Sequence, residues 1–272
     1  MRPVGPRAST RLLALVGHPV RRSRSPEMHN AALRARGIDA VYLALEVAPA
    51  RADRVVEALR TLGVAGANLT VPFKEAAVGQ VDSLHRSAQR AGSVNTLVMK
   101  AGRVRGYNTD GVGLLDHLRH LGRPQPRRAV VLGAGGTGRA VGAALLDQGA
   151  HVTLLNRTPE RARGVVAAWG QGDAGPLTAS AFAHAAATAD LVVRCTGGAG
   201  DATRALDPGG FGGSTWVDVN YWDDDPPHRA ALGDRFVGGL GMLAFQGARA
   251  LSLWIDDPVP GAELLDTLEA AP

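Results

Sequence analysis

The sequence of 272 residues predicts an α/β protein built from two domains. Three observations predict it. Strand-like apolar runs alternate with helical patterns through the first half, a glycine-rich loop directly follows an apolar strand in the second half, and Gly122-Arg123-Pro124-Gln125-Pro126 separates the halves. The length also exceeds the roughly 100–200 residues usual for one domain. We therefore expect a domain boundary at this proline-containing segment.

Short apolar runs mark the strands of the first half, and longer segments with an apolar residue every three or four positions mark its helices. The expected strands are 12–16, 41–47, 67–70, 94–99 and 104–107, and the expected helices are 26–36, 51–62 and 112–121. Helices between the first strands predict parallel pairing. Ser25 is expected as the N-cap of the first helix, with Pro26 at its first position and Gly37 as its C-terminal cap.

The second half begins with an apolar strand, 128–133, that enters the loop Gly133-Ala134-Gly135-Gly136-Thr137-Gly138. A helix to Asp147 and a strand at 151–155 complete a βαβ unit. Further strands are expected at 191–193 and 215–219, and the apolar helix 240–255 is expected to pack back on the first domain. The resulting division is a first domain over 1–121, a second over 122–238 and returning helices over 239–272.

Composition excludes several classes of protein. Hydrophobic residues make up 45% and charged residues 20%, which excludes wholesale disorder. The longest apolar runs fall short of the roughly 18 residues that cross a bilayer, and 12–16 is shorter than the roughly 7–15 residues of a signal-peptide core. Cys195, the single cysteine, cannot form an internal disulfide, and no cysteine and histidine spacing resembles a zinc site. We expect a soluble, cytoplasmic protein without a structural metal.

The net charge of +5 is spread along the chain, which argues against a nucleic-acid partner. Of the 30 basic residues only Lys74 and Lys100 are lysine. An ammonium can lose its proton when desolvated, whereas a guanidinium effectively cannot. Lys74 is therefore a candidate for chemistry, with a solvated surface charge as the alternative.

The glycine-rich loop fits the pattern G-x-G-x-x-G at Gly133, Gly135 and Gly138. These glycines allow a tight turn, close approach of the backbone to a pyrophosphate, and close packing of helix on strand. The position of the loop between a strand and a helix makes the pattern specific for a dinucleotide. A glycine-rich turn without a ligand is the alternative.

The end of the next strand predicts which dinucleotide is bound. An NAD site needs a carboxylate there for the ribose 2′-hydroxyl, but the sequence reads Asn156-Arg157-Thr158. Arg157 can form a charge-assisted fork with a 2′-phosphate, and Thr158 can donate its hydroxyl. NADP is favoured over NAD. Arg161 is either a second guanidinium for the phosphate or an exposed helix charge.

Polar residues gather in loops of the first half, which is where α/β proteins bind ligands. Taken singly, Ser25 and Asp110 can be helix caps and Asn95 a turn former. Taken together, hydroxyls, amides, one lysine and one aspartate suit a small polyhydroxylated carboxylate. These stretches are Ser23-Arg24-Ser25, Asn68 to Lys74, Ser93 to Thr96 and Asn108 to Gly111.

Taken together with further motifs, these residues resemble the shikimate dehydrogenase family over almost the whole length of the sequence. The resemblance rests on Gly17-x-Pro19, Ser23-x-Ser25-Pro26-x-x-His29, Asn68-x-Thr70-x-Pro72-x-Lys74, Asn95-Thr96, Asn108-Thr109-Asp110-Gly111, Gly133-Ala134-Gly135-Gly136, Asn156-Arg157-Thr158 and Gly239-Leu240-Gly241-Met242-Leu243-x-x-Gln246.

The resemblance implies reversible reduction of 3-dehydroshikimate to shikimate with NADPH, a step of aromatic amino-acid and chorismate biosynthesis. The reaction would take place between a substrate domain and a Rossmann-type domain. Lys74 and Asp110 would be the catalytic pair, in which Lys74 stabilises the developing alkoxide and supplies a proton and Asp110 orients the ammonium. The implied substrate-binding residues are Ser23, Ser25 and Tyr221 for the carboxylate, and Thr70, Asn95 and Gln246 for the ring oxygens. The implied cofactor-binding residues are Gly133, Gly135, Gly136, Gly138, Asn156, Arg157, Thr158, Arg161 and Gly239.

Two departures from the family pattern bear on the cofactor. Arg194-Cys195-Thr196-Gly197-Gly198-Ala199-Gly200 stands where the family usually has Asn-Ala-Thr, which puts cofactor affinity and loop order in question. Gly238 stands in place of the usual Asp directly before Gly239-Leu240-Gly241-Met242-Leu243.

Three alternatives remain open at this stage: a relative that acts on quinate, one that acts on an amino analogue of shikimate, and a non-catalytic NADP-binding sensor. Retention of Lys74, Asp110 and Gln246 argues against the sensor. The oligomeric state, monomer or homodimer, is open as well.

Overall fold

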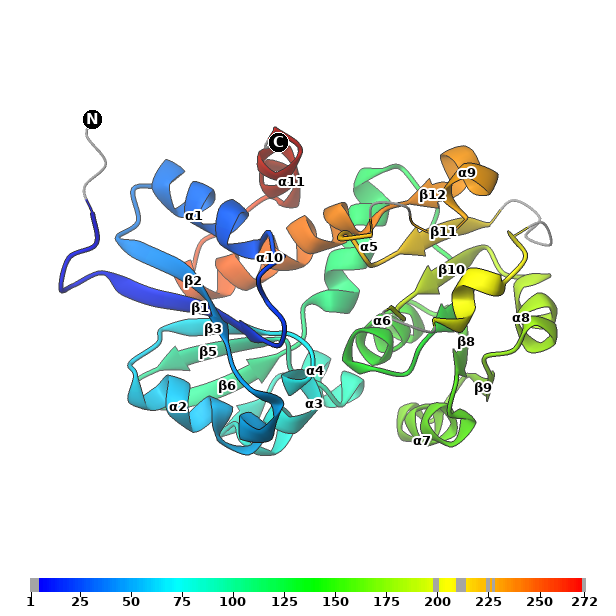
Figure 1. Cartoon of the computed structure of the whole chain (residues 1–272), viewed down its shortest axis with the longest axis horizontal. Coiled ribbons are helices and arrows are strands. Elements are labelled where there is room, and N and C mark those ends of the chain that lie inside the picture. Colours follow the sequence, from blue (N-terminus) through cyan, green and yellow to red (C-terminus); the bar gives the residue numbers. More distant parts are fainter. Residues whose placement is uncertain (1–4, 198–200, 209–213, 224–225, 227, 271–272) are drawn as a thin grey trace. The chain divides into compact units, whose positions relative to one another are not determined.

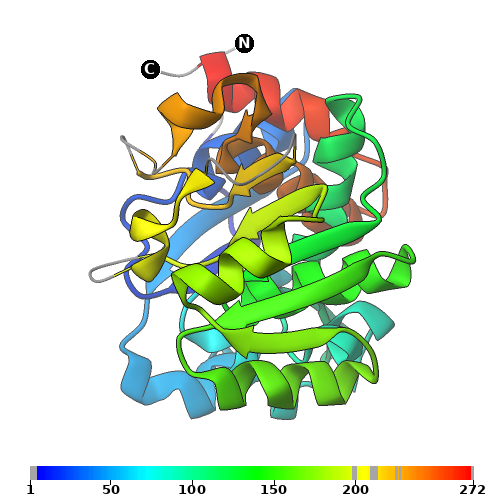
Figure 2. The ribbon, with the colours of Figure 1, turned by 90° about the vertical axis from the view of Figure 1, so that its right-hand side faces the viewer.

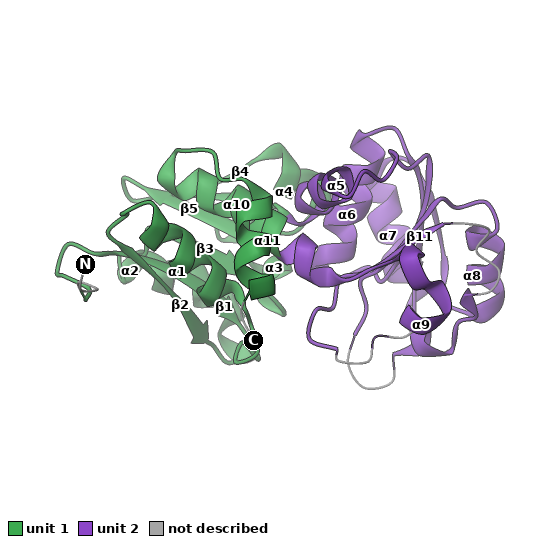
Figure 3. Cartoon of the chain, turned by 90° about the horizontal axis from the view of Figure 1, so that it is seen from above, with its two compact units in different colours: residues 1–109, 244–272 green, residues 110–243 purple. Residues whose placement is uncertain are grey.

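The structure is a computed structural model that describes residues 5–197, 201–208, 214–223, 226 and 228–270. The chain divides into two compact units (Figure 3). Unit 1 comprises residues 1–109 and 244–272, and unit 2 comprises residues 110–243. Each unit is built around its own six-stranded sheet. The expected α/β fold with two domains is confirmed.

The sheet of unit 1 has the strand order β2-β1-β3-β5-β6-β4. As expected, β1 pairs in parallel with both β2 and β3. In contrast, β5 runs antiparallel to β3 and β6. The reason for the second pairing is the two-residue turn Ala101-Gly102, in which both residues have positive φ (51° and 74°), the geometry of a tight hairpin. The strands are β1 (Arg11–Gly17), β2 (Ala40–Glu46), β3 (Gly66–Leu69), β4 (Ser83–Leu84), β5 (Thr96–Lys100) and β6 (Arg103–Tyr107).

The first helix of unit 1, α1 (Ser25–Ala35), begins one residue earlier than expected. Its N-cap is Arg24, and no side chain caps it, so the expectation that Ser25 is the N-cap was wrong. Pro26 lies in the first turn, and Gly37 follows the helix with a φ of 63°. That left-handed conformation suits glycine and ends the helix. The other helical segments before residue 110 are η1 (Pro49–Arg54), α2 (Val55–Thr61), α3 (Phe73–Ala76), η2 (Ala77–Gly79) and α4 (Arg86–Ala91).

Two C-terminal helices, α10 (Gly239–Ile255) and α11 (Gly261–Ala270), bring the end of the chain back to unit 1 (Figure 1). The Trp254 indole donates to the Leu97 carbonyl at 2.9 Å, and its ring fills the space that a side chain at Gly66 would need. Arg36, which follows α1, forms a two-pronged ion pair with Glu263 of α11, at 2.5 and 2.6 Å. The expected return of the C-terminal helix is therefore observed.

The sheet of unit 2 is parallel throughout, with the order β12-β11-β10-β7-β8-β9 (Figure 2). Numbered within the unit, this is the order 6-5-4-1-2-3 of a dinucleotide-binding Rossmann-type fold. The short edge strands β9 and β12 were not predicted from the sequence. The strands are β7 (Arg128–Leu132), β8 (His151–Asn156), β9 (Asp173–Pro176), β10 (Leu191–Arg194), β11 (Thr215–Asp218) and β12 (Phe236–Val237).

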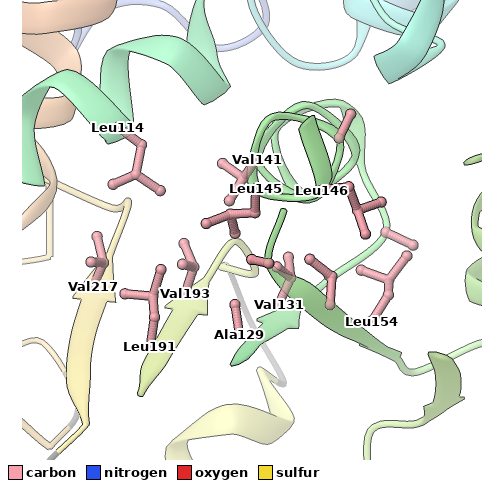
Figure 4. Packing of buried hydrophobic residues seen from close by; sticks show 14 of the residues in the cluster. Leu114, Ala129, Val131, Val141, Leu145, Leu146, Leu154, Leu191, Val193 and Val217 are labelled. Atoms are coloured by element: carbon pink, nitrogen blue, oxygen red, sulfur yellow. The ribbon is translucent and has the colours of Figure 1, made fainter. Parts of the chain in front are cut away.

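Helices cover both faces of this sheet because its strands are apolar on both sides. One face packs on α5, α6 and α7, and Figure 4 shows Val131, Leu145 and Val193 meeting there. The other face packs Phe182 of α8 against Trp216. The helical segments are α5 (Asp110–His120), α6 (Gly136–Asp147), α7 (Pro159–Trp169), α8 (Ala179–Ala186), η3 (Ala202–Ala205), α9 (Arg229–Leu232) and η5 (Gly233–Arg235).

The divisions between the units lie at 109/110 and 243/244, whereas the sequence analysis expects 121/122 and 238/239. The helix α5 accounts for the first difference, because it packs tightly on α6. A Cβ at Gly111 would lie 2.3 Å from the Ala140 carbonyl oxygen. The first turn of α10 accounts for the second, since Gly241 lies directly against the ring of His117 in α5.

Two features are absent from the described part of the chain. None of its helices has the length and apolarity to cross a membrane. Nor does it contain a group of three or more histidine, cysteine, aspartate or glutamate side chains arranged to hold a metal ion.

Candidate functional site

The glycine-rich loop of unit 2 connects β7 to α6, and its three glycines occupy three different environments. Gly133 has a φ of 107°, which a side chain would strain. A Cβ at Gly138 would lie 1.9 Å from the Gly133 carbonyl oxygen, so helix and strand touch there. A Cβ at Gly135, in contrast, would meet nothing within 4 Å. Gly135 thus presents bare backbone to open space at the N-terminus of the 12-residue helix α6, a site suited to a phosphate group.

The carbonyl and amide of Ala134 organise the polar side chains around this loop. The Asn156 side chain accepts from the Ala134 amide at 3.0 Å. Arg161 and Arg139 each donate Nε to the Ala134 carbonyl, both at 3.1 Å. From the sequence, Arg161 could be a phosphate ligand or an exposed charge, and Arg139, which lies three residues after the glycine that opens α6, was not predicted. Two guanidinium groups therefore converge beside the loop.

Arg157 and Thr158 lie between the end of β8 and the start of α7. No carboxylate follows β8 directly, because Asn156, Arg157 and Thr158 precede Pro159. Arg139 and Arg161 add two guanidinium groups at the neighbouring glycine-rich loop. This charge distribution suits a phosphate better than a ribose hydroxyl.

In unit 1 a buried network of amides and hydroxyls surrounds Asn95. The Asn95 side chain donates to Thr109 Oγ1 at 3.0 Å and to Gln246 Oε1 at 3.3 Å, and it accepts from the Thr109 amide at 2.8 Å. Asn95 is 2% exposed and Gln246 9% exposed. Hydrogen bonds of this kind fix amide and hydroxyl groups in one orientation. The network joins Asn95, directly before β5, to Thr109, the last residue of the first segment of unit 1, and to Gln246 in α10.

A second layer of polar groups supports this network. Asn68 donates to Thr96 Oγ1 at 3.1 Å and accepts from the Tyr42 hydroxyl at 2.8 Å, and Thr96 donates to Asn95 Oδ1 at 2.8 Å. Asn68, Thr96 and Thr109 lie inside the sequence motifs quoted above but were not singled out. Their position beside Thr70, Asn95 and Asp110 in the sequence was the signal that could have identified them.

Lys74 lies in α3, half-buried, and its backbone carbonyl accepts from the Val94 amide at 2.7 Å. That hydrogen bond ties α3 to the residue that precedes Asn95. Thr70, also half-buried, lies in the loop before α3, and its carbonyl accepts from the Phe73 amide at 2.9 Å. The structure thus brings Thr70, Lys74 and Asn95 to one end of the unit 1 sheet.

The two serines lie at the start of α1. Ser25 is 4% exposed, and its amide donates to Ser23 Oγ at 3.3 Å. Ser23 is half-buried, and its own amide donates to the Val20 carbonyl at 2.9 Å. The Ser23 and Ser25 hydroxyls therefore belong to the same backbone turn, at the start of α1.

Asp110, Tyr221 and Gly239 belong to unit 2. Asp110 is the first residue of α5, 4% exposed, and its Oδ2 accepts from Thr137 Oγ1 of the glycine-rich loop at 3.2 Å. Tyr221 packs edge-to-face on Trp222, with the ring centroids 4.9 Å apart. A Cβ at Gly239 would lie 2.4 Å from the Val219 carbonyl oxygen, so α10 begins directly against the end of β11.

The unusual segment begins at Arg194, the last residue of β10. Arg194 is 1% exposed and pairs with Asp201 and Asp218. Residues 198–200 of the segment lie outside the described residues.

Comparison with known proteins identifies both units. Residues 15–97 match the family model described as shikimate dehydrogenase substrate binding domain, and residues 118–203 match that of shikimate / quinate 5-dehydrogenase. The chain is 41% identical to shikimate dehydrogenase (NADP(+)) of Moorella thermoacetica over 280 residues, covering 97% of this chain and 95% of that protein.

The fold is similar to that of shikimate 5-dehydrogenase from Thermus thermophilus. The crystal structure with shikimate has a TM-score of 0.84 at 34% identity, and the one with NADP(H) and shikimate has a TM-score of 0.82 at 33% identity. Each comparison covers 95% of this chain and 98% of the other.

Proposed function

Because the chain belongs to the shikimate dehydrogenase family, we propose that it catalyses the reversible, NADP-dependent reduction of 3-dehydroshikimate to shikimate in aromatic amino-acid biosynthesis. The observation that carries this proposal is the buried network of Asn95, Thr109 and Gln246 at the same end of the unit 1 sheet as Lys74. Fixed amides and hydroxyls suit the ring hydroxyls of a polyhydroxylated acid, which a hydrophobic pocket would not distinguish.

The residues of unit 2 fit an NADP cofactor. The bare backbone at Gly135 and the N-terminus of α6 suit the pyrophosphate, and Arg157, Thr158 and Arg161 suit the 2′-phosphate. Arg139 adds a further guanidinium beside the loop. When bound, NADPH supplies the hydride for the substrate carbonyl.

Lys74 is proposed to act on the carbonyl oxygen of the substrate. Reduction turns this oxygen into an alkoxide, and an ammonium beside it stabilises the developing negative charge. The ammonium also donates the proton that completes the alcohol. In the reverse direction the neutral amine accepts this proton.

Asp110 is proposed to orient the Lys74 ammonium and to accept a hydrogen bond from a ring hydroxyl. Its carboxylate is held by the Thr137 hydroxyl at 3.2 Å and by its place at the first turn of α5.

The remaining proposed residues contact the substrate carboxylate, its ring hydroxyls and the cofactor. The hydroxyls of Ser23, Ser25 and Tyr221 are proposed to donate to the carboxylate, and Thr70 joins Asn95 and Gln246 at the ring hydroxyls. Gly239 is proposed to approach the nicotinamide through its backbone. The single cysteine agrees with a cytoplasmic location, which we also propose, with a monomer or homodimer as the working form.

Steady-state kinetics with shikimate, quinate and an amino analogue of shikimate, each with NADP and NAD, test the proposal. We expect shikimate with NADP to give the highest kcat/KM. A higher kcat/KM with quinate or with the amino analogue would reassign the substrate within the same family. NADP binding without oxidation of any of the three would identify a sensor and refute the proposed reaction.

A further inference from the structure

The side chain of Arg194 links the ends of the neighbouring strands β10 and β11 to Asp201 and Thr203, which lie in the connection between the two strands. Arg194 is the last residue of β10, and its register partner in β11 is Asp218, also the last residue of its strand. The guanidinium contacts Asp218 through Nη1, Asp201 through Nη2 at 2.5 Å, and Thr203 Oγ1 through Nε at 2.7 Å. The side chains of both aspartates are at most 1% exposed. Such a planar fork presents its N–H donors in a fixed geometry, whereas an ammonium has only three rotatable donors on a flexible stem.

Each aspartate, held by Arg194, accepts hydrogen bonds from backbone and side-chain groups of the residues around it. Asp218 Oδ1 accepts from the Asn220 amide at 3.0 Å and from the Asn220 side chain at 2.8 Å. That side chain also donates to the Thr196 carbonyl at 2.7 Å. Asp201 Oδ1 accepts from Thr196 Oγ1 and from the Thr203 amide, both at 3.0 Å. Through the two carboxylates, Arg194 therefore holds Thr196, in the middle of residues 195–197, together with Asn220 and Thr203.

The backbone held in this way borders the glycine-rich loop. A Cβ at Gly133 would lie 2.8 Å from Thr196 Cγ2 and 3.2 Å from the Cys195 carbonyl oxygen. On the other side, Gly239 touches the Val219 and Asp218 carbonyls. In this fold ligands bind beyond the carboxyl ends of the strands, where the strand order reverses, which here is between β7 and β10. Arg194 ends one of these two strands.

The electrostatics of the cluster require all three charged groups. Burial raises the pKa of the Asp218 carboxyl, and hydrogen bonds from Asn220 and Arg194 act in the opposite direction. Burial acts in the same sense on Asp201, but hydrogen bonds from Thr203 and Arg194 leave its pKa below the usual range. Removing the guanidinium would leave two buried carboxylates without their cation, which is strongly unfavourable.

We propose that Arg194 is a positioning residue for the nicotinamide end of the cofactor. It fixes residues 195–197 after β10 and residues 219–220 after β11, between which the nicotinamide and its ribose would lie, and has no part in holding the adenine end. The proposal rests on the proposed function, because it requires NADP as the ligand. It also assigns a task to the arginine that departs from the family's usual asparagine.

The test compares two ligands, of which only one has a nicotinamide end. NADP carries both ends, whereas adenosine 2′,5′-bisphosphate carries the adenine and the 2′-phosphate but no nicotinamide. Both dissociation constants are measured by calorimetry on the full-length protein and its variants. Arg194→Lys keeps the charge but loses the fork, and Thr203→Val removes the hydroxyl that joins Arg194 to Asp201.

We expect Arg194→Lys to weaken NADP binding by about tenfold and Thr203→Val by about threefold, the range for disturbed hydrogen bonds to charged groups. Binding of the bisphosphate should stay unchanged in both. Ser214→Ala is the matched control, because Ser214 is 4% exposed and bonds to the Ala189 carbonyl at the opposite ends of β10 and β11. It should change neither dissociation constant.

Equal weakening of both ligands, or of neither, would overturn the positioning role. If Arg194→Lys does not fold, Thr203→Val decides by the same criterion. A parent protein that fails to bind NADP would overturn both this inference and the proposed function. A parent that binds NADP without reducing 3-dehydroshikimate refutes the proposed reaction alone, and the comparison of the two ligands still decides the role of Arg194.

Discussion

The buried imidazole of His29 makes the stability of unit 1 depend on pH. His29 lies on α1 with no exposed surface, stacked on the Tyr42 ring with the centroids 4.3 Å apart. Burial lowers the pKa of this imidazole from 6.5 to about 3. The folded unit therefore holds the neutral ring through the whole range of ordinary buffers.

The sign and size of the effect follow from proton linkage. Between pH 6.5 and about 3 the unfolded chain binds a proton at His29 that the folded chain does not. Stability from this group is fully present above pH 6.5 and is lost as the pH falls toward 3. Each pH unit in this window is worth about 1.4 kcal/mol, so lowering the pH from 7 to 5 removes about 2 kcal/mol.

His29→Phe keeps an aromatic ring against Tyr42 and removes the titration. Urea unfolding at pH 7 and pH 5 gives the loss of unfolding free energy for each protein, with Trp254, whose ring centroid lies 5.5 Å from that of His29, as a fluorescent reporter. We expect the loss in the variant to be smaller by about 2 kcal/mol. His184→Gln, on the exposed side of α8, is the control and should behave like the parent. Equal losses in parent and His29→Phe would refute the reasoning.

Three further predictions concern the proposed site. Lys74→Ala should lower kcat by roughly 10²–10⁴-fold and leave the substrate dissociation constant largely intact, and Lys74→Arg should not restore kcat, because guanidinium is a poor proton donor. A rise in KM alone would make Lys74 a binding residue. Arg157→Ala should raise the KM for NADP on the order of tenfold, with little effect on the KM for NAD; equal effects would contradict the assignment to the 2′-phosphate. Gly135→Ala should weaken NADP binding at unchanged Tm, whereas Gly138→Ala should lower the stability by about 1–3 kcal/mol, because its Cβ meets the Gly133 carbonyl. Calorimetry and thermal melts separate the two, and a stable Gly138→Ala would count against the close contact.

Features with local causes were predictable from the sequence. The loop from Gly133 to Gly138 was placed correctly between strand and helix, because each glycine meets its requirement within a few residues. The N-cap of α1 was misplaced by one residue, since Ser25 and Arg24 compete for a position that only the backbone geometry decides. The hairpin at Ala101-Gly102 was missed because a single glycine gives a weaker signal than Asn-Gly.

Features with distant partners were not predictable. Arg194 looks like a disturbance of the cofactor loop when only its neighbours are considered. Its partners Asp201 and Asp218 lie 7 and 24 positions away, and only the parallel pairing of β10 with β11 brings the second one alongside. In the same way, the hydrogen bond from Asn95 to Gln246 spans 151 positions.

The return of the C-terminal helices to unit 1 has a consequence for the order in which the chain is made. A ribosome completes residues 110–243 before it reaches Trp254, the residue that packs on Gly66 of β3. Unit 2 therefore has its whole sequence available while unit 1 still lacks the indole that covers Gly66. Until Trp254 has emerged, the part of unit 1 around Gly66 stays uncovered on the nascent chain, although the strands of that sheet were synthesised before unit 2.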